Sequence, residues 1–201
     1  MRTKPDPQTA AFGIDIGKKV FHVVALNAAG SVIQRAKFSR DTLLAFFDAA
    51  PNALISMEAC PGSQWLARRL ATMGHDARII PAHFVKPYVK WNKTDTVDAA
   101  AIAEAVTRPT MCFVEVRTPE QIDLQALHRI RDRLVGQRTA LINQARAFCL
   151  EHGLAMRVGA GGFHADIRRH LGNVENDLTP AMRVLLEELL DDLAYIEGHD
   201  R

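Results

Sequence analysis

The chain has 201 residues, of which 48% are hydrophobic and 24% are charged, and its formal net charge is +2. No apolar run approaches the roughly 18 residues of a membrane-spanning helix, so no membrane partner is expected. Three widely separated cysteines, Cys60, Cys112 and Cys149, argue against a disulfide framework or a CxxC zinc site and fit a reducing cytoplasm. Residues 1–163 carry a balance of +7 and residues 164–201 carry −5, which makes the basic part the candidate polyanion surface.

The first half of the chain predicts a mixed β-sheet flanked by helices. Residues 1–10 are charged and contain prolines, and predict a disordered leader. Strands are expected over residues 11–16, 20–26 and 31–38 as an antiparallel meander, followed by strands over residues 53–57 and 77–80. Helices are expected over residues 41–49, from Pro61 to Met73, and around Asp95 to Ala105. Strands that first pair in a meander and then alternate with helices predict an α/β domain over residues 11–112.

The remaining chain predicts helices. Residues 113–158 contain a long helix, expected from Pro119 to about Gly153, in which apolar residues recur every seven positions. These are Leu127, Leu134, Leu141 and Phe148, and they predict a coiled coil with another helix. The alternative is a helix packed back on its own domain. Residues 159–201 predict a flexible linker at positions 159–162 and an amphipathic helix from Pro180, leading to a further C-terminal domain.

Four acidic residues carry the chemistry that the sequence suggests. Asp15 and Glu58 lie at the ends of apolar strands, where an ionised carboxylate is costly to desolvate without a compensating partner. Asp95 and Asp98 share one face of a helix, where their like charges repel. Together the four acids suggest a site for Mg²⁺ or Mn²⁺. The alternatives are that turn amides satisfy Asp15, that a helix N-terminus favours Glu58, and that the aspartate pair is a solvated helical turn.

A segment between the last strand and the aspartate pair interleaves three lysines with aromatic residues. Lysines bind phosphates and aromatic rings stack on bases, so residues 83–93 predict contacts with nucleic acid. The alternative is a loop over the core with solvated lysines. Arginines on the long helix extend the basic track, although a solvated face explains them equally well. The candidate nucleic-acid-binding residues are Lys18, Lys86, Tyr88, Lys90, Trp91, Lys93, Arg129 and Arg133.

The order of the acids resembles a known family. A strand with Asp15, a strand followed by Glu58, and the block Lys93-Thr94-Asp95-Thr96-Val97-Asp98-Ala99 are similar to the DEDD transposases of the IS110 family, particularly the IS1111 subgroup, and to the pilin-gene invertases. The K-x-D-x-x-D-A block is the most specific part, and the resemblance covers essentially the whole chain. It implies a RuvC-like, ribonuclease-H fold followed by a long helical coiled-coil extension.

The resemblance also implies a function. It makes Asp15, Glu58, Asp95 and Asp98 the metal-binding catalytic tetrad of an Mg²⁺-dependent DNA recombinase. It implies DNA and a structured noncoding bridge RNA as partners, a homo-oligomer (dimer or tetramer) formed through the long helix, and a nucleoid-associated location in a bacterium. Family members also have a C-terminal domain with a nucleophilic serine, a role that we assign to none of the four serines present. The alternatives are a free-standing junction-resolving endonuclease, a non-catalytic nucleic-acid-binding and oligomerisation module, and, more distantly, an actin-like kinase.

Overall fold

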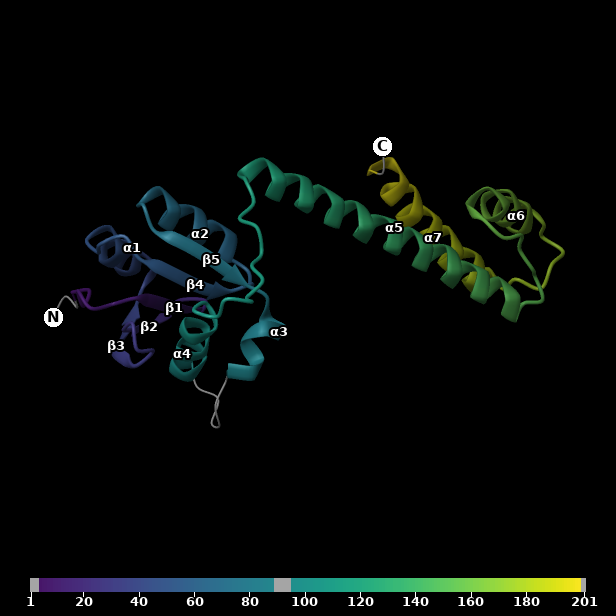
Figure 1. Cartoon of the computed structure of the whole chain (residues 1–201). Helices are drawn as coiled ribbons and strands as arrows, with labels where there is room; N and C mark the ends of the chain where they lie inside the picture. The colour runs from purple at the N-terminus through teal and green to yellow at the C-terminus, as the bar shows by residue number, and fades with distance from the viewer. Residues whose placement is uncertain (1–3, 89–94, 200–201) are drawn as a thin grey trace. The chain divides into compact units, whose positions relative to one another are not determined.

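The computed structural model describes residues 4–88 and 95–199, and the chain separates into two compact units at residues 118 and 119. The first unit is an α/β domain around one five-stranded sheet (Figure 1). Its strands are β1 (Ala11–Ile16), β2 (Phe21–Leu26), β3 (Val32–Phe38), β4 (Leu54–Glu58) and β5 (Asp76–Ile80). The strand order is β3-β2-β1-β4-β5, with antiparallel pairs on the β3 side and parallel pairs on the β5 side. The predicted strands and the mixed sheet are confirmed, and the architecture is consistent with a ribonuclease-H-like fold.

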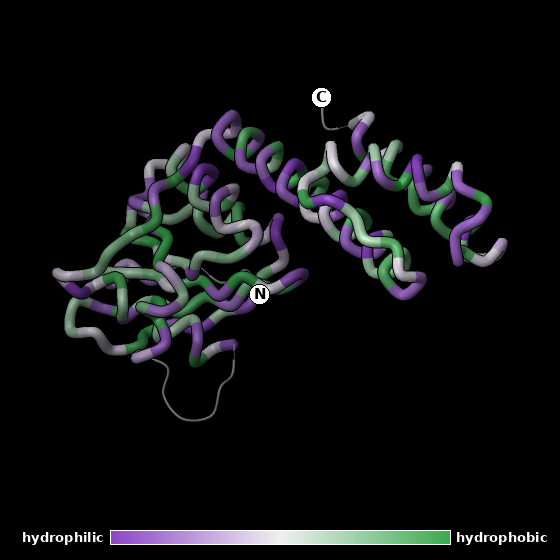
Figure 2. The backbone as a smooth tube through the Cα atoms, turned by 90° about the vertical axis from the view of Figure 1, so that its right-hand side faces the viewer, coloured by the Kyte–Doolittle hydropathy of each residue, from purple (hydrophilic) through white to green (hydrophobic). Residues whose placement is uncertain are grey.

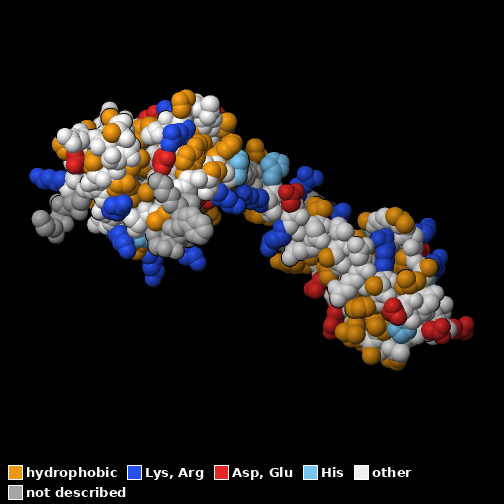
Figure 3. Space-filling view, turned by 60° about the horizontal axis from the view of Figure 1, so that its bottom comes forward, with side chains coloured by type: hydrophobic (Ala, Val, Ile, Leu, Met, Phe, Trp, Pro, Cys, Tyr) orange, Lys and Arg blue, Asp and Glu red, His pale blue; other side chains and the backbone are white. Residues whose placement is uncertain are grey.

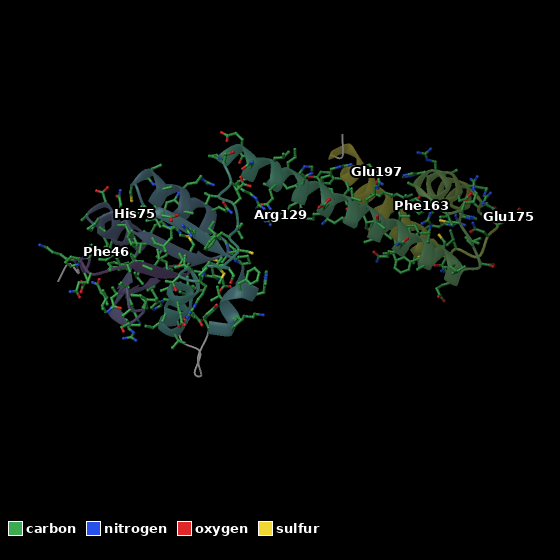
Figure 4. All side chains as sticks on the ribbon, in the orientation of Figure 1. Phe46, His75, Arg129, Phe163, Glu175 and Glu197 are labelled. Atoms are coloured by element: carbon green, nitrogen blue, oxygen red, sulfur yellow. The ribbon has the colours of Figure 1, made fainter. Side chains whose placement is uncertain are left out.

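One face of the sheet is covered by α1 (Arg40–Asp48) and α2 (Ser63–Thr72), as Figure 1 shows. Ser39 caps α1 through a reciprocal capping box with Thr42. The core on this face is aromatic, and Phe12 makes edge contacts with Phe46 and Phe47. Because side chains alternate across a strand, Phe12 and its neighbours two residues along point into this core. Figure 4 labels Phe46 and the buried His75 in this layer.

The opposite face is covered by α4 (Asp95–Ala105), which crosses β1, β2 and β4. The helix approaches unusually closely, because a Cβ added at Gly13 would lie 2.7 Å from the Cβ of Ala103 and closer still to the Ala99 carbonyl oxygen. Ser56 of β4 pairs with Gly13 of β1. Its hydroxyl lies 3.1 Å from the Phe12 carbonyl oxygen and 3.0 Å from the Ile102 carbonyl oxygen. Glycine on one strand and serine on the next therefore hold α4 against the sheet.

The segment between β5 and α4 is partly helical. It forms α3 (Ala82–Val85) and a 3₁₀ turn, η1 (Lys86–Tyr88). Residues 4–10, expected to belong to a disordered leader, contain a turn in which the Thr9 amide donates to the Asp6 carbonyl, and Gln34 donates to the Lys4 carbonyl. No helix in the two described ranges is both long and apolar enough to cross a membrane.

The second unit is helical and consists of α5 (Pro119–Glu151), α6 (Ala160–Gly172) and α7 (Pro180–His199). Figure 1 shows α7 running back along α5. Phe163 of α6 is fully buried in the shared core, in the region that Figure 4 labels. Figure 2 shows hydrophobic and hydrophilic stretches alternating along these helices, the pattern of helices that bury one face.

The predicted flexible linker at residues 159–162 is wrong, because residues 160–162 form the first turn of α6. Gly159 has φ +87°, which a residue with a side chain rarely adopts, and a Cβ at Gly162 would lie 2.9 Å from the Cβ of Arg157. These glycines therefore let the chain turn closely around Arg157, which pairs with the buried Asp166 at 2.9 Å. A glycine-rich composition predicts flexibility, whereas here it permits tight packing.

The heptad positions of α5 have two different environments. Leu141 and Phe148 pack against the core of the second unit, together with the buried Ile142 and Cys149. Leu127, in contrast, is 62% exposed, and Leu124 and Ile130 on the same part of α5 are exposed as well. The second half of this heptad series therefore packs within the chain itself, which was the alternative to a coiled coil. The coiled coil itself stays a prediction that concerns the first half.

Candidate metal centre and nucleic-acid interface

Strand alternation gathers acidic residues at one edge of the sheet. Asp15 is two residues beyond Gly13 on β1, so its side chain projects on the same face as α4. Met57 of β4 pairs with Ile14, which places Glu58 beside Asp15 at the ends of two parallel strands. The helix α4 begins at this edge with Asp95 and Asp98 in its first turn. Asp95, Asp98 and Glu58 therefore lie close enough to Asp15 to act on its charge, and the four acids come from three elements.

The four acids interact electrostatically. The pKa of Asp15 is raised, first because burial disfavours its charged form and then because Asp95 and Asp98 repel the negative charge, with Glu58 adding a smaller contribution. The neighbouring Cys60 thiol has a raised pKa because of burial and of the charges on Glu58 and Asp15. Cys60 is therefore kept as a thiol, which is a poor nucleophile and a poor metal ligand.

Two buried polar atoms at this edge have no hydrogen-bond partner within residues 4–88 and 95–199. One is Oδ1 of Asp98 and the other is Nδ1 of His22. An unpaired buried carboxylate oxygen is costly, so an oxygen of this kind fits a cation that the acids would share. Asp15, His22 and Asp95 each offer one donor atom to a common point, with all three atoms within 4.8 Å of one another. The donors present suit a hard divalent cation.

The predicted nucleic-acid-binding residues fall into three groups. Lys18 is exposed in the turn that follows Asp15, and Lys86 is exposed in η1, which packs beside α4. The Tyr88 ring is half-buried, and the Arg108 guanidinium lies 5.6 Å from its centre, so the ring already has a partner. Figure 3 shows Lys and Arg side chains at several places on the first unit in that view.

The remaining candidates form the other two groups. Lys90, Trp91 and Lys93 are outside the described residues. Arg129 and Arg133 belong to the second unit, where both are exposed and lie four residues apart on one face of α5. The structure therefore places Lys18 and Lys86 in the same unit as the acids, whereas these two arginines form a separate basic pair.

Comparison with known proteins decides the family. Residues 12–152 match the family of DEDD transposases of the IS110 type, which is described as transposase. This chain belongs to the IS110-type DEDD transposases. The transposase for insertion sequence element IS1328 of Yersinia enterocolitica is 38% identical over 192 residues, which cover 94% of this chain and 56% of that protein.

Two further transposases are similar over the same part. The transposase for insertion sequence element IS1111A of Coxiella burnetii is 41% identical over 181 residues, covering 90% of this chain and 50% of the relative. A probable family 20 transposase of Pseudomonas aeruginosa is 40% identical over 187 residues, covering 92% and 55%. The chain thus spans about half the length of the curated relatives that it matches.

Sequence reasoning did not select His22 or Ser56, which lie with Gly13 on the sheet face that α4 covers. His22 lies opposite Asp15 in the β1–β2 register, a pairing that the short turn at residues 17–20 made predictable. Gly13 and Ser56 lie under α4, and their signal was the presence of small residues in two otherwise bulky apolar strands. Their role depends on which helix covers the sheet, and a strand pattern by itself does not specify this.

Proposed function

We propose that this chain provides the metal-binding part of a transposase, in which Asp15, Glu58, Asp95 and Asp98 hold Mg²⁺ or Mn²⁺ beside a DNA phosphodiester. The observation that carries this proposal is the convergence of acids from β1, β4 and α4 around a buried Asp98 oxygen that has no hydrogen-bond partner among the residues the structure describes. Burial, and then repulsion by the other acids, raises the pKa of Asp15, and a bound cation would relieve that repulsion. The transposase family of the chain gives the centre its substrate class.

The residues around the centre have separate parts in this proposal. Bound divalent cations supply charge stabilisation to a phosphodiester and its attacking and leaving oxygens. The carboxylates hold the cations, while Gly13 and Ser56 fix the helix that carries two of them. Lys18, exposed in the turn after Asp15, is available to a DNA phosphate. The nucleophile in this proposal is the serine that the family resemblance places in a C-terminal domain. Its hydroxyl oxygen would attack the phosphorus while one P–O bond to deoxyribose breaks, and the released sugar oxygen would take up a proton as a free hydroxyl. The resulting phosphoserine link preserves the bond energy for rejoining.

The proposal extends to two partners. A structured guide RNA is supported by the excess of basic residues in the first 163 residues, which would serve RNA and DNA alike. A dimer or tetramer through α5 is supported by the exposed Leu124, Leu127 and Ile130 in the first half of that helix. Together these describe an RNA-guided, oligomeric DNA recombinase.

The test is Asp98→Asn in a chain that also carries the C-terminal transposase domain. We expect excision and exchange of an insertion-sequence substrate to fall by at least about a hundredfold, because one shared ligand is lost. Glu104→Gln is the matched control, since Glu104 lies on the same helix but is paired with Arg108 at 2.6 Å. Unchanged exchange in Asp98→Asn would refute the tetrad.

A second measurement separates the alternatives. The 201-residue chain is incubated with a four-way DNA junction and Mg²⁺. Under the proposal it binds the junction and leaves it uncut, because the nucleophile belongs to another domain. Nicking that Asp98→Asn abolishes would instead favour a junction-resolving endonuclease that activates water.

A further inference from the structure

His22 faces the proposed metal centre, although a search of the sequence for acidic ligands does not find it. The residue lies on β2 in register with Asp15, and alternation directs its side chain to the face that α4 covers. Its side chain is only 10% exposed. Its Nδ1 lies 3.5 Å from Oδ2 of Asp95 and 4.0 Å from Oδ2 of Asp15. A buried imidazole nitrogen is thus aimed between two carboxylates.

This nitrogen lacks the hydrogen bond that a buried histidine normally makes. His75, the other buried histidine among the described residues, accepts from the Ala53 amide at 3.2 Å and lies 2.9 Å from the Phe47 carbonyl oxygen. His22 Nδ1 has no such partner in the described part of the chain. A charge-assisted bond to a carboxylate would bring the atoms to about 2.7–2.9 Å. The observed separations are longer than that and leave space for a third atom.

The separations fit donors that share one ion. In octahedral coordination with bonds of about 2.1 Å, neighbouring donors lie about 3.0 Å apart and opposite donors about 4.2 Å apart. The two distances from Nδ1, 3.5 Å and 4.0 Å, lie between these two values, so a small rotation of the side chains would let the donors share one ion. A neutral imidazole with its proton on Nε2 offers Nδ1 as a lone-pair donor.

We propose that His22 is a nitrogen ligand of the metal centre, sharing one ion with Asp15 and Asp95. This inference rests on the proposed function of the acids and adds a fifth donor of a different kind. Imidazole nitrogen suits transition metals, whereas carboxylates suit Mg²⁺ and Mn²⁺. The position that includes His22 therefore prefers Mn²⁺ to Mg²⁺.

The test uses Mn²⁺ as the probe and pulsed electron paramagnetic resonance as the readout. The 201-residue chain loaded with Mn²⁺ should show a ¹⁴N coupling from a directly bound imidazole. Growth with ¹⁵N-histidine should convert it to a ¹⁵N coupling, which checks the assignment without any substitution. In His22→Asn the coupling should disappear and the dissociation constant for Mn²⁺ should rise by about tenfold. His83→Asn is the matched control, because His83 is an exposed histidine of the same unit.

Three other outcomes overturn the proposal in distinguishable ways. Mn²⁺ binding that is sensitive to Asp98→Asn but shows no nitrogen coupling would reject His22 as a ligand and leave the acids standing. A coupling that persists in His22→Asn, with the fold confirmed by circular dichroism, would assign it to another histidine. Absence of Mn²⁺ binding at millimolar concentration would reject the metal centre itself, and His22 with it.

Discussion

Replacing Gly13 with alanine should loosen the helix that carries half of the acids. The added Cβ would lie 2.7 Å from the Cβ of Ala103, whereas ordinary contacts begin at 3.4 Å, so α4 must move by at least about 0.7 Å. The closer clashes involve backbone atoms of Ala99 and Ala103, which cannot move without the helix. Ala99 directly follows Asp98, so the displacement reaches the proposed metal centre.

The magnitude follows from the cost of overpacking. Forcing one extra carbon into a packed interior costs about 1–3 kcal/mol, and a backbone clash places Gly13→Ala near the upper value. For a unit of this size that corresponds to a fall in melting temperature of roughly 10 °C. Metal sites tolerate displacements of only about 0.5 Å, so Mn²⁺ affinity should fall on the order of tenfold.

Thermal unfolding and Mn²⁺ titration of the same samples measure both effects. Two further glycine-to-alanine variants serve as controls, because they show what such a substitution does away from the contact between α4 and the sheet. Gly30→Ala meets no atom within 4 Å but has φ +77°, so it should cost about 1–2 kcal/mol and leave Mn²⁺ binding unchanged. Gly136→Ala lies in open space on α5 and should stabilise the second unit by about 0.5–1 kcal/mol. Wild-type stability and affinity in Gly13→Ala would refute the docking of α4 described here.

The remaining predictions concern charge and assembly. The raised pKa of Asp15 means that its ionised form opposes folding, so stability without divalent ions should fall as pH rises above the unfolded pKa near 3.8. Asp15→Asn should therefore raise the melting temperature of the metal-free first unit at pH 7 by a few degrees and remove the further rise that Mn²⁺ gives the wild type. A lower melting temperature for Asp15→Asn would contradict the repulsion argument. In the second unit, the Arg157 guanidinium lowers the pKa of Asp166 to about 2, so this pair stabilises the fold above pH 4 and its contribution is lost as pH falls towards 2. Asp166→Asn should flatten the decline in helical signal over that range, and an unchanged pH profile would reject the role of the pair. Leu127→Glu should abolish self-association in light scattering without lowering helicity, because Leu127 is 62% exposed in one chain. Unchanged self-association would exclude this part of α5 from the interface.

Local patterns in the sequence were sufficient to predict most of the sheet. Strand signals in the first forty residues located the meander, and Asp15 and Glu58 are candidate ligands because each interrupts an apolar strand at its end. These signals are local, since burial and turn geometry act within a few residues. Asp95 and Asp98 were recognised by their spacing on a helix of small residues, and that helix is present.

The features that sequence reasoning missed depend on contacts between distant segments. His22 is conspicuous only once β1 and β2 are in register and α4 covers their face. Gly13 lies under Ala99 and Ala103, some ninety residues later in the chain, and a local pattern does not specify which helix approaches it. Gly161 and Gly162 predicted a linker by composition, but packing around Arg157 places them in a helix. Tertiary contacts overrode local propensity at each of these positions.

A crystal of this chain soaked in Mn²⁺ tests the central claim most directly. Anomalous difference maps should show a manganese peak surrounded by carboxylate oxygens of Asp15, Glu58, Asp95 and Asp98, and the peak should be absent in Asp98→Asn. Carboxylates that remain splayed apart with no anomalous peak between them at saturating Mn²⁺ would contradict the account.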